Sequence, residues 1–496
     1  MKNKVARLLC LIICLATVLT FFAACNTGDG NDKETDTQEQ ETNAPIVGGP
    51  ATDENGYELD SINRTLGGKT MTILFNETEK NRVYCAEDYK YGSDTISDEV
   101  YMSNLELEER MQCTIEPIFV PGENSNRVEF LTVAQSAGDH NIDIICSFSL
   151  WPAVLASQGY LSNLNNLAYP EIDKPWWSKS IKDWEHEGAL YFVSNNSSIG
   201  IFQSLETMFY NVDMVEDYGL NDLLPIVIEG KWTMDLMLEY AKHVDTNIDD
   251  PFEERVYGLA VDDWSRMDMF LYGAGIHFVE KNGVGELELL IDTATNKERV
   301  ISLITKLGEI AQYDEFHIES NNMLTMHDGR TMFFAGSLNK VTKIPDSVNY
   351  TVIPVPKFND DQKEYYSVNN NGYDMWCIPA TCNDKEDSAI LIEAFASDAY
   401  RNLAPFYYED KLKMRYSDSE LGAQVFDIIR DSVSADFGRV CSQSIGILES
   451  GFRYCFWTNN KQTYNTDYIS QLEIKLATHT IQFPEVLAAF AKYKDR

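Results

Sequence analysis

Short apolar runs alternate with amphipathic stretches along the chain from Leu66 onward. The apolar runs are five to seven residues long, which is the usual length of a buried strand. On this pattern we predict strands at residues 70–75, 114–120, 142–146, 206–210 and 350–355.

Helical patterns fall between these runs. One predicted helix begins at Thr295, where Glu298 completes a capping box and one face carries Val300, Leu303, Ile304 and Leu307. A second begins at Thr233, and a third follows Asp384. Strands and helices that alternate over more than 400 residues predict α/β architecture with largely parallel sheets.

The amino terminus has a different composition. Lys2, Lys4 and Arg7 precede an apolar run at residues 8–22, which is the construction of a secretion signal. The sequence Phe-Ala-Ala-Cys that ends at Cys25 resembles the bacterial lipobox, in which the cysteine is diacylated and becomes the first mature residue. We therefore predict a lipoprotein signal peptide at 1–24. The alternatives are an uncleaved signal anchor or an ordinary signal cut elsewhere, and each of them also exports the body.

Residues 25–60 predict a disordered acidic tether behind the lipidated cysteine. From residue 26 to 60 the chain holds ten acidic residues and one lysine, with almost nothing apolar. Such a segment cannot recover its ordering entropy through burial, and its like charges keep it extended.

The net charge of the chain argues against two classes of binding partner. The 496 residues contain 40 Lys plus Arg against 78 Asp plus Glu, a formal charge of -38. Binding of nucleic acid or of an anionic membrane surface depends on clustered cations, so this balance argues against both. A neutral solute agrees better with the composition, and attachment to a membrane would rest on acyl chains.

Cysteines and histidines show no metal-binding spacing. Apart from Cys25, seven cysteines remain in the mature chain, an odd number with no C-x-x-C pair, and Cys146 lies in an apolar run as a buried small side chain. Residues 245–249 alternate acids and an amide as a calcium loop does, but the sixth position is Asp250 and the twelfth is Val256, where such loops have Gly and Glu. We predict no metal site and no cofactor.

Several stretches, in the same order and at similar spacing, resemble segments of one protein family. They lie at residues 138–145, 151–155, 158–164, 209–214, 218–220, 230–235, 327–334 and 350–356. They include a G-Y-L-x-x-L segment that begins at Gly159, a Y-N-x-D strand at Tyr210 and a Trp-Thr helix start at Trp232. Together these stretches are similar to the extracellular solute-binding proteins of bacterial ABC importers, in the group that includes maltose-binding-type receptors.

The resemblance implies a two-lobe periplasmic-binding-protein-like fold of type II, with a ligand cleft between lobes that crossing strands join. Carried onto this chain, lobe 1 would hold 64–207 plus 368–400, and lobe 2 would hold 208–367 plus 401–496. The crossing strands would lie at 205–210 and 367–376. Residues 401–496 match the family only as generic helices.

Neutral sugars are bound by aromatic faces and by planar polar side chains, so the candidates are residues of these types at strand ends that the resemblance places beside the cleft. Trp151 follows the third predicted strand, and Asp263 and Trp264 follow the apolar stretch 256–261. Asn371 and Tyr373 lie on the second crossing strand. For the tryptophans the alternative is core packing, and for Asp263 and Asn371 it is a helix cap or a turn.

The function that the resemblance implies is capture of a small solute, a mono- or oligosaccharide, and its delivery to the permease subunits of an ABC importer. The protein would be a monomer on the outer face of the cell membrane, held by palmitate-type acyl chains on Cys25. The alternatives are a secreted carbohydrate-active enzyme, or a two-lobe sensor that passes its ligand signal to a receptor. The sequence has no nucleophile elbow and no P-loop.

Overall fold

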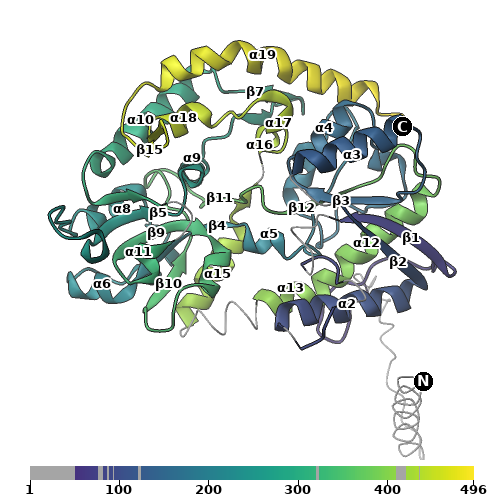
Figure 1. Cartoon of the computed structure of the whole chain (residues 1–496), viewed down its shortest axis with the longest axis horizontal. Helices are drawn as coiled ribbons and strands as arrows, with labels where there is room; N and C mark the ends of the chain where they lie inside the picture. The colour runs from purple at the N-terminus through teal and green to yellow at the C-terminus, as the bar shows by residue number, and fades with distance from the viewer. Residues whose placement is uncertain are drawn as a thin grey trace, which may run out of the picture. The chain divides into compact units, whose positions relative to one another are not determined.

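The computed structural model describes residues 51–75, 82–85, 89–92, 94–120, 124–319, 323–408, 420–434 and 436–496. Residues 52–496 form one compact unit (Figure 1). The predicted signal peptide and Cys25 lie outside the described residues.

The first sheet has the strand order β12-β3-β1-β2. Its strands are β1 (Lys69–Phe75), β2 (Cys113–Phe119), β3 (Ile144–Phe148) and β12 (Asp374–Cys377). β1 runs parallel to both of its neighbours, with Ile73 opposite Ile144 and Pro117. The three strands predicted in this part of the sequence are therefore confirmed within one or two residues.

The second sheet has the order β10-β4-β9-β5-β8. Its strands are β4 (Glu206–Asn211), β5 (Tyr257–Val261), β8 (Phe316–Ile318), β9 (Thr331–Ser337) and β10 (Tyr350–Ile353). Every residue of β4, β5 and β9 is buried, because helices cover both faces of this sheet. The other strands form small two-stranded sheets: β6 (Val279–Lys281), β7 (Leu287–Leu289), β11 (Ser367–Val368), β13 (Val433–Ser434), β14 (Trp457–Thr458) and β15 (Lys461–Gln462).

The prediction of largely parallel sheets is wrong for the strands at which the chain passes between the sheets. β4 runs antiparallel to β9 and β10, and β12 runs antiparallel to β3. A chain that leaves one sheet and enters the other arrives from the opposite end, so its strand is inserted against the direction of its neighbours.

The two passages lie side by side. Leu205, directly before β4, forms an antiparallel bridge with Asn369, which follows β11. We call residues 204–206 and 367–373 the crossing segments. They agree in position with the crossing strands that the sequence predicts.

The described residues also form α-helices. Those of the described residues are α2 (Thr95–Met111), α3 (Asn124–Ser136), α4 (Pro152–Ser157), α5 (Gly200–Gln203), α6 (Val212–Asp217), α7 (Leu223–Ile228), α8 (Met234–Ala241), α9 (Asp268–Gly273), α10 (Ala294–Ala311), α11 (Leu324–His327), α12 (Lys385–Arg401), α13 (Leu403–Pro405), α15 (Glu420–Asp431), α16 (Phe437–Val440), α17 (Ser442–Ile445), α18 (Ser450–Tyr454) and α19 (Tyr468–Lys492).

Helix starts test the capping predictions. The helix start predicted at Thr233 is confirmed, and Thr233 caps α8 by accepting a hydrogen bond from the Leu236 amide. The predicted capping box at Thr295 is wrong, because α10 begins at Ala294 and Thr293 caps it by accepting from the Asn296 amide. The apolar face that includes Val300 is buried as expected.

Residues 52–60 and helix α19 differ from the predicted division into tether and lobes. The last nine residues of the predicted tether bind the body, since Asp60 is buried against Arg110 and Ser397 and Glu58 pairs with Lys174 at 2.7 Å. We call residues 52–60 the strap. Burial of these ion-paired side chains orders an end of the segment that composition alone predicts to be disordered.

The sequence prediction places helix α19, with the rest of 401–496, in lobe 2. In the structure α19 contacts α17 and α18 on one side and α4, which follows β3 of the first sheet, on the other (Figure 1). Near its start Tyr468 packs against Gly451, and near its end Phe490 contacts Tyr191, which also donates a hydrogen bond to the Phe490 carbonyl. At 25 residues this helix is long enough to reach from one group of elements to the other.

All seven cysteines of the body are free thiols and all are buried: Cys85, Cys113, Cys146, Cys377, Cys382, Cys441 and Cys455. Cys146 is fully buried in β3, in agreement with its prediction as a small core residue. Burial raises the pKa of the Cys441 thiol well above its usual value, which disfavours the reactive thiolate.

Candidate functional site

The turn that follows β3 brings three of the five predicted site residues together. Its residue Ser149 donates its amide to the Tyr373 carbonyl at 2.9 Å and its hydroxyl to the Asn371 carbonyl at 3.0 Å. Trp151 ends the same turn and directly precedes α4, whose first residue is Pro152. A strand end and a crossing segment thus place Trp151, Asn371 and Tyr373 in one neighbourhood.

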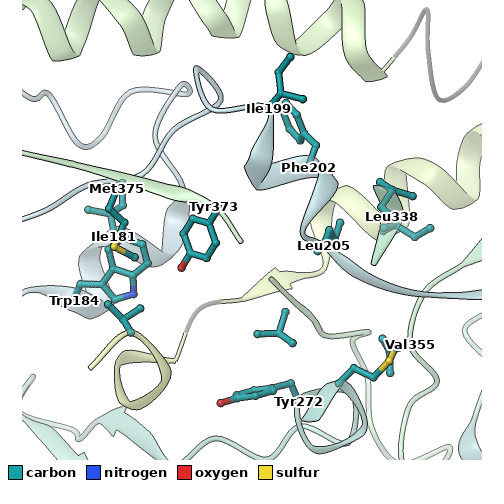
Figure 2. Close-up of a cluster of buried hydrophobic side chains, with 14 of the residues drawn as sticks. Ile181, Trp184, Ile199, Phe202, Leu205, Tyr272, Leu338, Val355, Tyr373 and Met375 are labelled. Carbon is teal, nitrogen blue, oxygen red and sulfur yellow. The ribbon is translucent and has the colours of Figure 1, made fainter. Parts of the chain in front are cut away.

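These three side chains differ in their exposure to a ligand. Tyr373 is buried, and burial raises its pKa to about 12 despite the nearby Arg439. Figure 2 shows it among the buried hydrophobic side chains of this region. Trp151 is half-buried, and its indole Nε1 has no hydrogen-bond partner among the described residues. A donor on a half-buried ring can be bonded by a water or a ligand, so Trp151 is a stronger candidate than the buried Tyr373.

The other two predicted residues follow β5. Asp263 caps the short 3-10 helix Trp264–Met267 by accepting the Ser265 amide at 2.9 Å, so the capping alternative for Asp263 is correct. Trp264 leaves 37% of its surface exposed. The guanidinium of Arg453 lies 5.3 Å from the centre of the Trp264 ring, within the range of a cation–π contact.

Arg453 belongs to a buried group of charges that sequence reasoning missed. Asp268, the first residue of α9, accepts from Arg453 Nε at 2.7 Å and from Arg439 Nη1 at 3.0 Å. Glu449 accepts from Arg439 Nη1 at 3.0 Å and from the Tyr272 hydroxyl at 2.7 Å. Burial disfavours the charge of Asp268, but Arg453 and Arg439 outweigh burial and lower its pKa. We call these five residues the arginine cluster.

The arginine cluster joins the two groups of predicted residues. Arg439 Nε donates to the carbonyl of Asn369 on the second crossing segment at 3.1 Å. The same arginine binds Asp268, four residues after Trp264. One side chain thus connects the crossing segment of Asn371 and Tyr373 with the helix that follows Trp264.

A signal for these arginines exists in the sequence. Arg439 and Arg453 lie in the apolar stretches Asp-Phe-Gly-Arg-Val and Gly-Phe-Arg-Tyr, in a chain with few cations. An arginine inside an apolar stretch is rarely buried unless it is paired. That signal predicts a buried ion pair but does not name the partner, which is 171 residues away for Arg439 and 185 for Arg453.

A second polar group lies at the start of β4. Glu206 Oε1 accepts from Arg266 Nη1 at 3.0 Å and from the Ser337 hydroxyl at 3.3 Å, and Asn370 Nδ2 donates to that hydroxyl at 2.6 Å. Burial raises the pKa of Glu206, and Arg266 opposes this rise. Glu206 Oε2 and Arg266 Nε are buried and have no partner among the described residues. They provide one free acceptor and one free donor beside the crossing segments.

Each buried cation of this region is paired with a carboxylate. Lys340 pairs with Asp262 at 2.7 Å, and Arg266 pairs with Glu206. In the arginine cluster two arginines face two carboxylates. Because Asp436 is also buried and, among the described residues, accepts only backbone amides, the region has no excess of cations with which to attract an anionic solute, and it offers an aromatic face and hydrogen-bonding atoms.

Within the part of the chain that the structure describes, no three His, Cys, Asp or Glu side chains converge as a metal site would require. The same residues include no helix with the length and apolar character that a bilayer crossing needs.

The fold defines the class of protein. Two sheets that exchange strands through paired crossing segments are the architecture of a two-lobe type II binding protein. The family model of bacterial extracellular solute-binding proteins matches residues 108–401, and this chain belongs to that family. No curated protein sequence matches the chain.

Solved structures agree on the fold. One is the galacto-N-biose/lacto-N-biose I-binding protein of an ABC transporter from Bifidobacterium longum, at 11% identity and a TM-score of 0.56, with 85% of this chain and 98% of that one covered. Another is maltose-bound MalE3 of T. maritima, at 13% identity and a TM-score of 0.52, covering 83% and 99%. A third is UgpB from Mycobacterium tuberculosis in complex with glycerophosphocholine, at 14% identity and a TM-score of 0.52, covering 82% and 99%. At these identities the likeness shows the fold alone.

Proposed function

We propose that this protein is an extracellular receptor that captures a neutral mono- or oligosaccharide between its two lobes and delivers it to an ABC permease. The observation that carries the proposal is the partly exposed face of Trp264 beside buried cations that are all paired. An aromatic face binds the C–H-rich face of a sugar, and the free atoms of Glu206, Arg266 and Trp151 suit hydroxyl groups.

The similar structures bind neutral sugars or a phosphodiester, and the pairing of the buried cations in this chain favours a neutral sugar. A phosphodiester such as glycerophosphocholine requires cations or backbone amides that are free to meet the phosphate. Here Arg439 and Arg453 are each held by a buried carboxylate, and Lys340 is held by Asp262. Breaking such a pair leaves an unpaired buried charge, so a neutral polyhydroxy ligand is favoured over an anionic one.

The proposed mechanism is a change of conformation and involves no chemical reaction. Open and closed arrangements of the lobes exchange, and a ligand that contacts both lobes stabilises the closed one. Trp264 and Arg266 would contact the ligand from the side of β5, and Trp151 from the side of β3. The arginine cluster, which touches the crossing segment through Asn369, fixes the position of Trp264 relative to that segment.

Lipidation of Cys25 is the proposed attachment, with palmitate-type chains holding the receptor at the outer face of the membrane. Mass spectrometry of the mature amino terminus tests this directly. A diacylated Cys25 is expected, and a mature chain that begins at another residue would refute the lipoprotein assignment.

The test of function is thermal shift of the intact chain against neutral sugars, amino acids, peptides, polyamines and glycerophosphodiesters. Since a ligand that binds only the folded state raises the melting temperature, micromolar affinities are visible at millimolar ligand. We expect shifts with sugars and no released product. A shift confined to charged solutes would refute the neutral-ligand proposal, and cleavage of a bound glycan would favour the enzyme alternative.

A further inference from the structure

A cavity of about 460 Å³ lies against the crossing segments, and none of the five predicted ligand-binding residues lines it. Its size is within the range of small-molecule sites. Five aromatic side chains are part of its wall: Tyr57, Trp177, Phe202, Tyr400 and Tyr408. We call it the hinge cavity.

The hinge cavity and the candidate site lie on opposite faces of the crossing segments. Successive side chains of an extended segment point to opposite faces. Leu205 and Asn369, which form the bridge between the segments, both line the hinge cavity. The next residue on each segment, Glu206 and Asn370, bonds instead to Ser337 on the face of the candidate site. The cavity is therefore a separate place in the fold.

The aromatic rings are held in fixed positions. Tyr57 of the strap and Tyr400 of α12 meet edge to face at 5.3 Å and 85°, and Phe202 and Tyr408 do so at 4.7 Å and 84°. Trp177 is fixed by a hydrogen bond of 3.2 Å from its Nε1 to Glu393. Phe202 also stacks on Tyr407 at 5.4 Å and 15°, so the ring faces that remain available to a ligand are those of the partly exposed Tyr57 and Tyr400.

Polar groups in the same wall are free to bind. The hydroxyls of Tyr57, Tyr400 and Tyr408 have no hydrogen-bond partner among the residues that the structure describes. Asn196 also lines the cavity. The charged pair Arg430 and Asp431 is joined at 3.2 Å, so the wall carries no free charge there.

From this combination we propose that the hinge cavity is a second binding site, for a neutral polyhydroxy ring compound of about monosaccharide size. The faces of Tyr57 and Tyr400 would stack on the C–H face of the ring, and the free hydroxyls with the Asn196 amide would bond its hydroxyl groups. A phosphate or carboxylate ligand would find no free cation, and a purely apolar ligand would leave the polar groups unbonded.

Occupancy of the hinge cavity is linked to the arrangement of the lobes. Trp177 and Asn196 come from the side of the first sheet, whereas Arg430 lies on α15, which packs against α7 and β10 of the second sheet. A ligand that contacts both sides binds the two lobe arrangements unequally and therefore shifts the balance between them.

The experiment separates the hinge cavity from the candidate site and does not depend on the proposed function. Trp264→Ala is introduced to weaken the candidate site, and the intact variant is titrated with glucose, galactose, mannose and myo-inositol by saturation-transfer NMR. We expect at least one of these probes to bind at millimolar concentration. Adding Tyr408→Phe or Asn196→Ala should weaken that binding at least threefold, and both together at least tenfold.

A third variant, Ala404→Phe, fills the cavity and should abolish the binding; if it does not fold, the two smaller substitutions decide alone. Binding that is unchanged by Tyr408→Phe plus Asn196→Ala would overturn the second site. Failure of all four probes to bind the Trp264→Ala chain would overturn it as well. Sugar capture at the candidate site is measured separately in the chain that retains Trp264.

Discussion

Replacing Trp264 with Ala should weaken sugar binding strongly while leaving the ligand-free protein folded. The exposed part of this side chain is the surface that a ligand can cover, and it amounts to 37% of the residue. For an aromatic side chain of about 250 Å² this is about 90 Å². At about 25 cal/mol per Å², its coverage contributes about 2 kcal/mol, or about thirtyfold in the dissociation constant.

The cost to stability is smaller because the ring is only partly packed. Its contact with Arg453 is worth about 0.5–1 kcal/mol, and Arg453 keeps its pair with Asp268 in the variant. A total loss of about 1–2 kcal/mol corresponds to a fall of a few degrees in melting temperature. Isothermal titration with the sugar found by thermal shift gives the affinity, and calorimetry of the ligand-free chain gives the stability.

Two variants serve as controls. Trp264→Phe retains a stacking face and should recover most of the affinity. Trp457→Ala removes another partly buried tryptophan, from the small sheet of β14 and β15, and should leave the affinity unchanged. If Trp264→Ala instead unfolds early with unchanged affinity per folded molecule, Trp264 is a core residue and its assignment to the site is wrong.

Three further predictions concern buried carboxylates. Replacing Asp268 with Asn removes a charge that two arginines share, so the free energy of unfolding in urea should fall by about 3 kcal/mol or more. The control Asp263→Asn keeps the helix cap and should change this free energy by less than about 1 kcal/mol. Equal losses in the two variants would contradict the role of the arginine cluster. Burial raises the pKa of Glu393 to about 7, so the folded state binds this proton more tightly than the unfolded state. The contribution of Glu393 to the free energy of unfolding should therefore decrease as pH rises from about 4.5 to about 7. Glu393→Gln should remove this contribution, and a pH dependence of stability equal to that of the wild type would refute the assignment. Asp60→Asn weakens the attachment of the strap to Arg110, so a glutamate-specific protease should cut after Glu58 faster than in the wild type, without a change in sugar affinity. Equal cutting rates would show that other contacts hold the strap.

The local pattern of the sequence determined most of the secondary structure. Strands at β1, β4 and β10 and the cap at Thr233 depend on residues a few positions apart, so periodicity and side-chain chemistry are sufficient to predict them. Order and spacing of the family-like segments also predicted the two-lobe fold and the positions of the crossing segments. The choice of Thr295 over Thr293 was wrong although only Thr295 has a glutamate three residues later, because packing of the helix and not the capping-box pattern decides where it begins.

Tertiary structure decided the composition of the candidate site. The family resemblance placed Trp151, Asp263, Trp264, Asn371 and Tyr373 beside one cleft, but the sequence did not predict the arginine cluster that connects the crossing segment with Trp264. Its arginines find Asp268 across 171 and 185 residues, and no local rule selects one carboxylate among 78 acidic residues. The same limit applies to the strap and to the hinge cavity. Their partners are adjacent only after folding, because burial and ion pairing depend on distances that the order of residues does not contain.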